Sequence, residues 1–296
     1  MNSRIVTLGV VQHASRHDKE QNLARAMVGI REAASRGASL VVLPELFASD
    51  YFCQTEDPNQ FDLAEPLDGR TVSAVADLAR ELEIEVVTPL FEKRARGLYH
   101  NSLVVVGRDG SSLGIYRKMH IPEDPQFCEK FYFTPGDLGF CPIQTQSATL
   151  GALICWDQWF PEAARAMALA GAEILVYPTA IGWMASEKEA LGEAQLDAWR
   201  TIQRSHAIAN GTFVVAANRV GREHSASAEL EFWGHSFVCD PSGRVIAEAG
   251  EGEEVLVVTC DLHAIEEQRR WWPFFRDRRI DAYDGLCERW IGSTRE

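Results

Sequence analysis

Between residues 150 and 183 the sequence alternates between strand and helix within a short span. Leu150–Ile154 is small, apolar and typical of a buried strand, and it leads directly to Cys155. Pro161 opens a helix that Gly171 ends, and a second apolar strand follows. This order of elements favours the mixed α/β class, in which helices pack against sheets.

The same alternation continues along the rest of the chain. Hydrophobic periodicity predicts helices over residues 18–35, 71–82, 161–170, 187–210 and 262–270. Apolar runs predict strands over residues 5–11, 40–43, 85–91, 101–106, 112–117, 153–155, 174–177, 212–218, 234–239, 245–249 and 254–260, with hairpin turns at 108–111 and 240–243. We expect more than one sheet, and two stacked sheets with helices outside would make four layers. No linker or repeat interrupts the pattern, so a single domain over residues 1–296 is predicted.

The charge and the cysteines limit the partners and the compartment of the chain. A formal net charge of −14 argues against nucleic-acid binding, which needs a clustered cationic surface. Seven cysteines without a CxxC pair fit reduced thiols better than a disulfide framework, and they favour the cytoplasm. Residues 1–12 lack a basic segment followed by a long apolar run, and no stretch of about 18 apolar residues exists, so neither a signal peptide nor a membrane span is expected. The histidines show no HxH spacing, and no metal site is expected.

Three of the predicted strands end in chemically useful side chains, namely Glu45, Lys118 and Cys155. Sites in α/β sheets form outside the carboxyl ends of strands, so these groups could converge. There Lys118 would lower the pKa of the thiol, and Glu45 would take its proton and return it to a leaving nitrogen. The backbone N–H of Trp156 and the Lys118 ammonium would hold the oxyanion of a tetrahedral intermediate.

Each of these residues also has a plain structural explanation. A single cysteine at the end of an apolar strand is usually a small buried hydrophobe, and a lone Glu or Lys is usually solvated. No rule of order or spacing brings the three together. The residues alone therefore leave the catalytic and the structural explanation open.

Three motifs, taken together, favour the catalytic explanation over the structural one. The segments LVVLPELF around Glu45, YRKMHIP around Lys118 and LICWDQWFPE around Cys155 resemble the carbon–nitrogen hydrolases of the nitrilase superfamily, in the order found in that family. The resemblance implies a four-layer αββα sandwich, a Glu–Lys–Cys triad on these three residues, and no metal or organic cofactor. A fourth motif, CEKFYFTPGD, places a second family glutamate at Glu129, which would position Lys118 or the substrate.

A narrower resemblance bears on the substrate. The segments YFCQ, IPEDPQFCEKFYFTPGD, CWDQWFPEAARAMALAGAEILVYPTAIG and WWPFFRDRRI are similar to N-carbamoylputrescine amidases. This similarity implies hydrolysis of a terminal ureido group to putrescine, carbon dioxide and ammonia in polyamine biosynthesis. The chain departs from many members after TAIG, where WMASEKEALGE replaces a short Ser-Glu-Pro segment, so the loop at 183–193 leaves the preferred substrate open. The alternatives are 3-ureidopropionate, another N-carbamoyl amino acid or a linear amide, and a catalytically silent binding or scaffold protein.

The charge of the substrate tail would determine which side chains bind it. A ureido amine carries an ammonium group, which favours an acidic or aromatic cage, whereas a ureido acid favours an arginine fork. Near the motifs only Arg117 could form such a fork, and as the neighbour of Lys118 on a strand it would point away. The candidates to contact the tail are Tyr51, His120, Trp156, Asp157, Trp183 and Glu187.

The C-terminal segment, residues 262–296, is rich in aromatic residues. Trp271, Trp272, Phe274 and Phe275 would be an aggregation risk if they were exposed. We expect this segment to pack on its own domain or on a neighbouring subunit, and the family resemblance implies a homo-oligomer built on a dimer.

Overall fold

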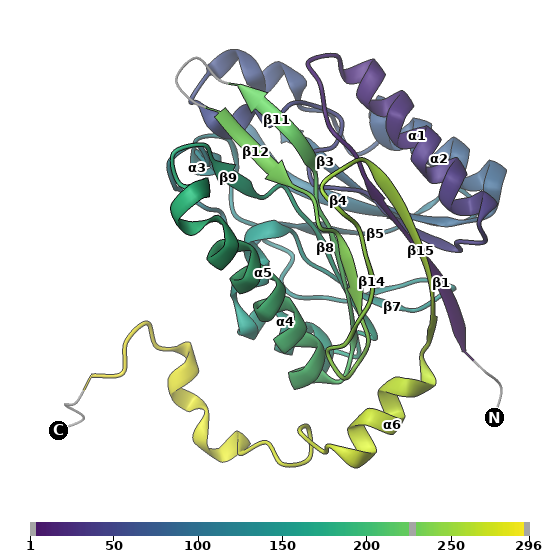
Figure 1. Ribbon diagram of the computed structural model, residues 1–296, viewed down its shortest axis with the longest axis vertical. Coiled ribbons are helices and arrows are strands. Elements are labelled where there is room, and N and C mark those ends of the chain that lie inside the picture. Colours follow the sequence, from purple (N-terminus) through teal and green to yellow (C-terminus); the bar gives the residue numbers. More distant parts are fainter. Residues whose placement is uncertain (1–3, 225–228, 293–296) are drawn as a thin grey trace.

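The computed structural model describes residues 4–224 and 229–292 and contains two large sheets that stack face to face (Figure 1). The first sheet has the strand order β15-β1-β2-β3-β4-β5. Its strands are β1 (Ile5–Gln12), β2 (Leu40–Val42), β3 (Glu85–Ala95), β4 (Leu98–Val106), β5 (Ser112–Arg117) and β15 (Glu254–Asp261). β1, β2 and β3 are parallel, because helices connect them, and tight turns make β3, β4 and β5 antiparallel.

Two helices, α1 (Lys19–Ser35) and α2 (Arg70–Leu82), cover the outer face of the first sheet. The Asp18 side chain caps α1 by accepting the backbone N–H groups of Glu20 and Gln21, as the sequence pattern requires. Strand residues alternate between the two faces, so Val11 packs under α1 while Val10 points into the space between the sheets.

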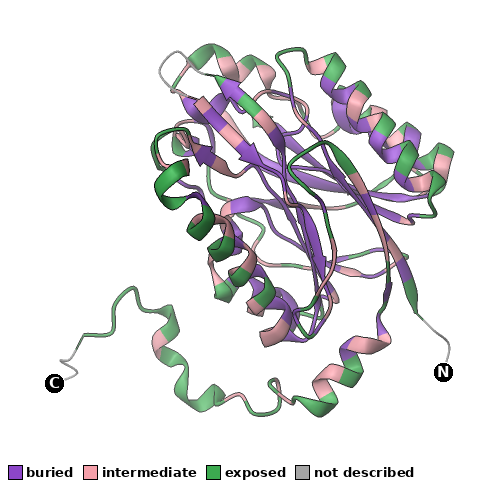
Figure 2. Ribbon diagram, in the orientation of Figure 1, coloured by how far each residue is buried: buried purple, intermediate pink, exposed green. Residues whose placement is uncertain are grey.

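The second sheet has the strand order β14-β13-β10-β8-β7-β6. Its strands are β6 (Ile143–Gln144), β7 (Thr149–Ala152), β8 (Ile174–Pro178), β10 (Phe213–Ala217), β13 (Phe237–Cys239) and β14 (Val245–Glu248). Helices α4 (Pro161–Leu169) and α5 (Lys188–Asn210) cover its outer face. Helix, sheet, sheet and helix thus follow one another, which confirms the predicted four-layer αββα sandwich. Figure 2 shows that the buried residues concentrate in the two sheets and on the inner faces of the helices.

A third, small sheet was not predicted. It consists of β9 (Gly182–Met184), β12 (Glu229–Trp233) and β11 (Val220–His224), with β12 in the centre. These strands are short, and two of them are rich in charged residues, so no apolar run marks them in the sequence. The side chains of Leu230 and Phe232 nevertheless point inward and are buried beside Tyr51 and Phe91.

The C-terminal segment leaves the sandwich, and much of it is exposed (Figures 1 and 2). Helix α6 (His263–Trp271) is anchored by the buried side chain of Ile265 and by a hydrogen bond from Arg269 to the Asn210 carbonyl. Beyond it, short 3₁₀ turns at Ile280–Ala282 and Asp284–Cys287 lead away from the body. Trp271 and Trp290 are 83% and 84% exposed. Most of this segment is therefore exposed in the single chain, and its last four residues lie outside the described part.

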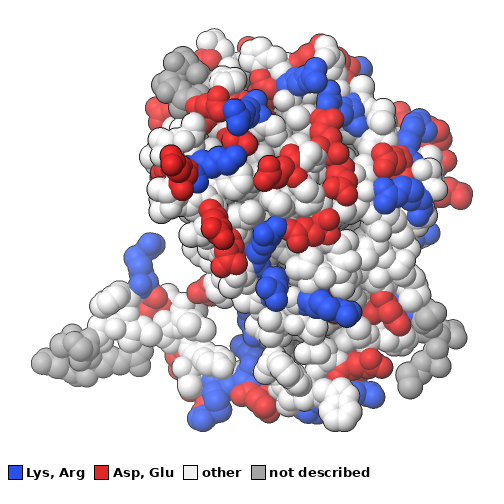
Figure 3. Space-filling model, in the orientation of Figure 1, with Lys and Arg blue, Asp and Glu red and all other residues white. Residues whose placement is uncertain are grey.

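The surface and the helices bear on the expected partners. On the face seen in Figure 3, Lys and Arg side chains are interspersed with Asp and Glu and do not gather into one basic patch. In residues 4–224 and 229–292, no helix is long and apolar enough to cross a lipid bilayer. All seven cysteines are free thiols.

Candidate active site

Cys155 lies in a tight turn rather than at the end of a strand. β7 ends at Ala152, and a 3₁₀ turn runs over Cys155–Trp159, so the predicted strand over 153–155 was wrong. The Asp157 carboxylate accepts the backbone N–H of Ile154 at 2.9 Å and bends the chain back on itself. Cys155 has φ +41°, a conformation that a residue with a side chain adopts only where its surroundings enforce it.

The strand directions bring the other candidate groups to the same edge. β2 and β3 are parallel, and β3, β4 and β5 alternate in direction, so β2 and β5 both end at this edge of the first sheet. Glu45 follows β2 and Lys118 follows β5. Glu129 begins the short helix α3 (Glu129–Tyr132). Lys118 Nζ donates to Glu45 Oε1 at 2.8 Å and to Glu129 Oε2 at 2.6 Å, and all three side chains are fully buried.

The two carboxylates have different hydrogen-bond partners. Both oxygens of Glu129 are occupied, because Tyr51 donates its hydroxyl to Oε1 at 2.7 Å and Lys118 binds Oε2. In Glu45, Lys118 and the Asn101 amide both donate to Oε1, the latter at 2.7 Å. Glu45 Oε2 is buried and has no hydrogen-bond partner among the described residues. Both oxygens of Glu129 therefore have a partner, whereas one oxygen of Glu45 has none among the described residues.

Burial dominates the ionisation of the nucleophile. It raises the pKa of the Cys155 thiol well above its ordinary value, Glu45 raises it further, and Lys118 offsets only part of the rise. This reverses the expectation that Lys118 lowers the pKa of the thiol below its ordinary value, because two carboxylates accompany the one ammonium. This direction favours the thiol over the thiolate, and a nucleophilic role for Cys155 would require a base that removes its proton.

Burial also affects the charged neighbours of the cysteine. Burial and the nearby Glu45 raise the pKa of Glu129 to about 7, although Lys118 and Tyr51 work in the opposite direction. Burial disfavours the charge on Lys118, but Glu129 and Glu45 outweigh it and raise the pKa of the ammonium well above its ordinary value. Lys118 is therefore a permanent cation in this site.

A pocket of about 390 Å³ opens above Cys155. Its walls are largely apolar with four aromatic residues, and its charged members are acidic. They include Phe127, Trp156, Trp159 and Trp233 and the carboxylates of Asp124, Glu129 and Glu187. A thiol, a base with a free oxygen, a buried cation and a cavity beside them are the parts needed for nucleophilic attack on an amide-like carbon.

The chain as a whole matches a known protein family. The model of the carbon–nitrogen hydrolase family matches residues 7–270. The chain belongs to the carbon–nitrogen hydrolase family. It is thus a hydrolase that acts on carbon–nitrogen bonds, with a small molecule as its substrate.

Individual relatives of this carbon–nitrogen hydrolase cover almost the whole chain. The chain is 44% identical over 290 residues to the N-carbamoylputrescine amidase of Solanum tuberosum, which covers 96% of this chain and 95% of the relative. It is 39% identical over 287 residues to the citrullinase of Francisella tularensis, and this match covers 96% of this chain and 99% of the relative. A carbon–nitrogen hydrolase from Helicobacter pylori G27 has a similar crystal structure, with a TM-score of 0.95, 48% identity and coverage of 97% and 100%.

Two of the six predicted tail-binding residues, Trp156 and Glu187, line the pocket of this carbon–nitrogen hydrolase. Tyr51 does not, because its side chain is buried and its hydroxyl donates to Glu129. Trp183 does not either, because it is 5% exposed and donates its indole N–H to the Gly192 carbonyl at 3.0 Å.

The other two, Asp157 and His120, hold the nucleophile turn. The Asp157 carboxylate is fully buried and accepts the Tyr116 hydroxyl at 2.8 Å, in addition to the Ile154 amide. His120 bonds to the same carboxylate through its backbone N–H and through Nδ1, and its ring stacks on Phe160. Their polar groups are therefore used within the protein, behind Cys155.

Sequence reasoning missed several residues of the site. Asn101 binds Glu45, while Asp124, Trp159, Gln195 and Trp233 line the pocket. One signal was available for Asn101, because the polar run His-Asn-Ser interrupts an otherwise apolar strand. The pocket residues come from a loop, a 3₁₀ turn, a helix and a strand, and nothing local in the sequence marks them.

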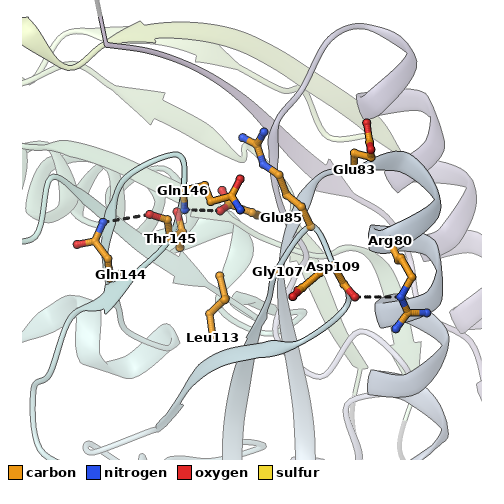
Figure 4. A pocket seen from close by; sticks show the side chains of 10 residues that line it. Arg80, Glu83, Glu85, Gly107, Asp109, Leu113, Gln144, Thr145 and Gln146 are labelled. Carbon is orange, nitrogen blue, oxygen red and sulfur yellow. Dashed lines mark hydrogen bonds between the residues drawn. The ribbon is translucent and has the colours of Figure 1, made fainter.

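A second hollow lies at the opposite edge of the sandwich (Figure 4). It has a volume of about 650 Å³ and lies beside the start of β3, whereas Glu45 follows the end of the parallel strand β2. Two of its charged groups, Glu85 and Arg80, are engaged within the protein. Glu85 accepts the backbone N–H of Gln146 at 2.6 Å, and Arg80 donates to the Asp109 carbonyl at 2.9 Å. This hollow contains no cysteine, and its residues stabilise turns.

Among the described residues, no group of three His, Cys, Asp or Glu side chains is placed to hold a metal ion.

Proposed function

We propose that the protein is an N-carbamoylputrescine amidase, which cleaves the terminal ureido group of its substrate to putrescine, carbon dioxide and ammonia. The observation that carries the proposal is the charge of the pocket. Asp124 and Glu187 supply carboxylates away from the cysteine, and neither Lys nor Arg is among the described residues that line the cavity. The terminal ammonium of a linear amine fits these walls, whereas the carboxylate of a ureido acid would be repelled.

Glu187 is also oriented for this role. Gln195 donates its side-chain amide to Glu187 Oε2 at 3.1 Å, which leaves Oε1 to accept from the ligand. The Gln195 carbonyl oxygen is buried and has no hydrogen-bond partner among the described residues. An ammonium group has three donors, so it satisfies both acceptors at once. The aromatic walls then pack along the methylene chain of the substrate.

The chemistry follows from the arrangement around Cys155. Glu45 Oε2 takes the thiol proton while Sγ attacks the ureido carbon, and a C–S bond forms. Lys118 and the backbone N–H of Trp156, in the first turn of the 3₁₀ helix, stabilise the oxyanion. Glu45 passes the proton to the leaving nitrogen as the C–N bond breaks and putrescine departs. Cys155 then carries a carbamoyl thioester.

Water completes the reaction. Glu45 takes a proton from the water that attacks the carbamoyl carbon, and it returns this proton to the sulfur as the C–S bond breaks. The released carbamic acid decomposes to carbon dioxide and ammonia. Glu129 acts on Lys118 throughout, because it accepts one N–H of the ammonium and so fixes its direction.

A second candidate has its own observation in the pocket. The indole N–H groups of Trp159 and Trp233 are buried and have no hydrogen-bond partner among the described residues. Two free donors favour a carboxylate in the ligand, as in an N-carbamoyl amino acid such as citrulline, and one relative is a citrullinase. A catalytically silent protein has no support, because the nucleophile, the cation and both carboxylates are present.

Ammonia release from N-carbamoylputrescine, citrulline and 3-ureidopropionate, measured side by side, tests the proposal. Cys155→Ala is the control for each substrate. We expect the highest kcat/KM for N-carbamoylputrescine and no release by the variant. A preference for citrulline would favour the second candidate function over the first. Ammonia release that does not depend on Cys155 would refute the thiol mechanism.

We also propose that the protein acts as a homo-oligomer built on a dimer. Trp271, Leu286, Trp290 and Ile291 are exposed on the C-terminal segment, and a second copy of the chain would cover them. Sedimentation should show a species of at least two chains, and a monomer at all concentrations would contradict this.

The seven free thiols support the cytoplasm as the compartment. A fluorescent fusion examined in the source cells tests this assignment.

A further inference from the structure

We propose that Asn101 is a positioning residue that selects Glu45 Oε2 as the oxygen that exchanges protons with Cys155 and the substrate. The inference rests on the role of Glu45 proposed above. Asn101 lies on β4 and is fully buried. Neither the sequence motifs nor the family resemblance pointed to it.

The hydrogen bonds of Asn101 connect it to two members of the triad. Its side-chain amide donates to Glu45 Oε1 at 2.7 Å. Its backbone carbonyl accepts the backbone N–H of Lys118 at 2.8 Å, which extends the ladder between β4 and β5 by one bond. One residue therefore fixes the carboxylate of Glu45 and the place at which the Lys118 side chain begins.

The two donors on Glu45 Oε1 determine what the other oxygen does. Lys118 and Asn101 both donate to Oε1, and two donors suffice to occupy its lone pairs. Oε2 has no partner among the described residues, although it is buried. A buried oxygen that keeps its lone pairs free is the stronger proton acceptor of the two. It is thus Oε2 that takes the proton of the thiol and later that of the water.

A single donor would not fix this choice. Without Asn101, Lys118 alone would hold Glu45, and rotation of the carboxylate would allow the ammonium to bind either oxygen. The free acceptor would then face the cysteine for only part of the time. The expected cost is a slower chemical step with little effect on substrate binding, because Asn101 is not among the residues that line the pocket.

The strand offers a matched control. Ser102 is the next residue of β4, is equally buried, and donates its hydroxyl to the Glu92 carboxylate at 2.6 Å. Its side chain points to the other face of the strand, and Glu92 is paired with Arg117 outside the pocket. Ser102→Ala therefore removes a buried hydrogen bond to a carboxylate from the same strand without touching the triad.

The experiment measures kcat and KM of Asn101→Ala with N-carbamoylputrescine, or with citrulline if that is the better substrate. We expect kcat to fall by about 10- to 100-fold, the range for a misplaced catalytic group, and KM to change less than about threefold. Ser102→Ala should keep kcat within about threefold. Thermal unfolding identifies a variant that fails to fold, and Asn101→Leu, which has nearly the same shape, then replaces Asn101→Ala.

A double-mutant cycle separates positioning from general damage. If Asn101 acts through Glu45, adding Asn101→Ala to Glu45→Gln lowers kcat no further. An additional loss in the double variant, a loss carried by KM, or an equal loss in Ser102→Ala would each overturn the inference. Full activity of Glu45→Gln would instead refute the proposed role of Glu45, so the two failures are distinguishable.

Discussion

The charge of the pocket can be tested by one atom-for-atom exchange. Glu187→Gln keeps the shape of the side chain and its contact with Gln195, but it removes the negative charge that should meet the ammonium of the substrate. A hydrogen bond to a charged partner contributes about 1.5–3 kcal/mol. Glu187 is only half-buried and water screens it, so the lower end applies, which corresponds to about a tenfold loss.

The assay compares two substrates with the same four-carbon chain. N-carbamoylputrescine carries the terminal ammonium, and butylurea has the same four-carbon chain without it. For N-carbamoylputrescine we expect KM to rise about tenfold in Glu187→Gln with kcat nearly unchanged, because the contact is present in both ground and transition state. For butylurea we expect KM to stay the same or to fall.

Glu189→Gln is the matched control for the charge itself. Glu189 lies in the first turn of α5, two residues from Glu187, but it is exposed and is not among the lining residues. The same change in net charge there should leave both substrates unaffected. An equal loss for butylurea, or an unchanged KM for N-carbamoylputrescine, would refute the assignment of Glu187 to the ammonium.

Three further predictions concern the buried ionisable groups. Because the pKa of the Cys155 thiol is raised, its alkylation by iodoacetamide, followed by peptide mass spectrometry, should still accelerate from about pH 7 to 9, and a plateau below pH 7 would contradict this. Lys118→Met should destabilise the fold by about 3–5 kcal/mol in urea unfolding, since two buried carboxylates lose their cation, and adding Glu129→Gln should restore part of the loss. Burial lowers the pKa of His13 from 6.5 to about 4, so the native state resists its protonation, and stability is lost as pH falls through this range. The difference in unfolding free energy between the wild type and His13→Gln should narrow by about 3 kcal/mol between pH 7 and 4. A constant difference would show that protonation of His13 does not cause the loss of stability.

The sequence predicted the large elements of the fold because their signals are local. Asp18 before α1 and the apolar runs of β1 and β8 sufficed to place these elements. The third sheet was missed because β11 and β12 are short and rich in charged residues, and the contact that buries Phe232 of β12, with Tyr51, is distant in sequence. The end of β7 was misplaced because the Asp157 side chain, rather than a backbone propensity, turns the chain.

For the site, the motifs predicted which residues come together but not how their polar atoms are paired. Tyr51 and Asp157 have the chemistry of ligand-binding residues, yet their polar groups are engaged by Glu129 and by the nucleophile turn. Asn101 shows the converse, because an amide inside a strand gains a role only through a carboxylate 56 positions away in sequence. Such long-range partners are set by sheet register, which a single sequence does not display.

The net charge of the site explains why its hydrogen bonds are asymmetric. Glu45 and Glu129 contribute two potential negative charges and Lys118 one positive charge, so the buried cluster favours an additional proton. Glu129 takes up part of that demand, since its pKa is raised to about 7, and the Cys155 thiol stays protonated. A thiolate would add a further negative charge to this volume, which burial opposes. The site thus disfavours an ion pair between the cysteine and the lysine. In the mechanism proposed above, the attack needs a base for the thiol proton, and Glu45 suits this role because Oε1 has two donors and Oε2 has no partner among the described residues.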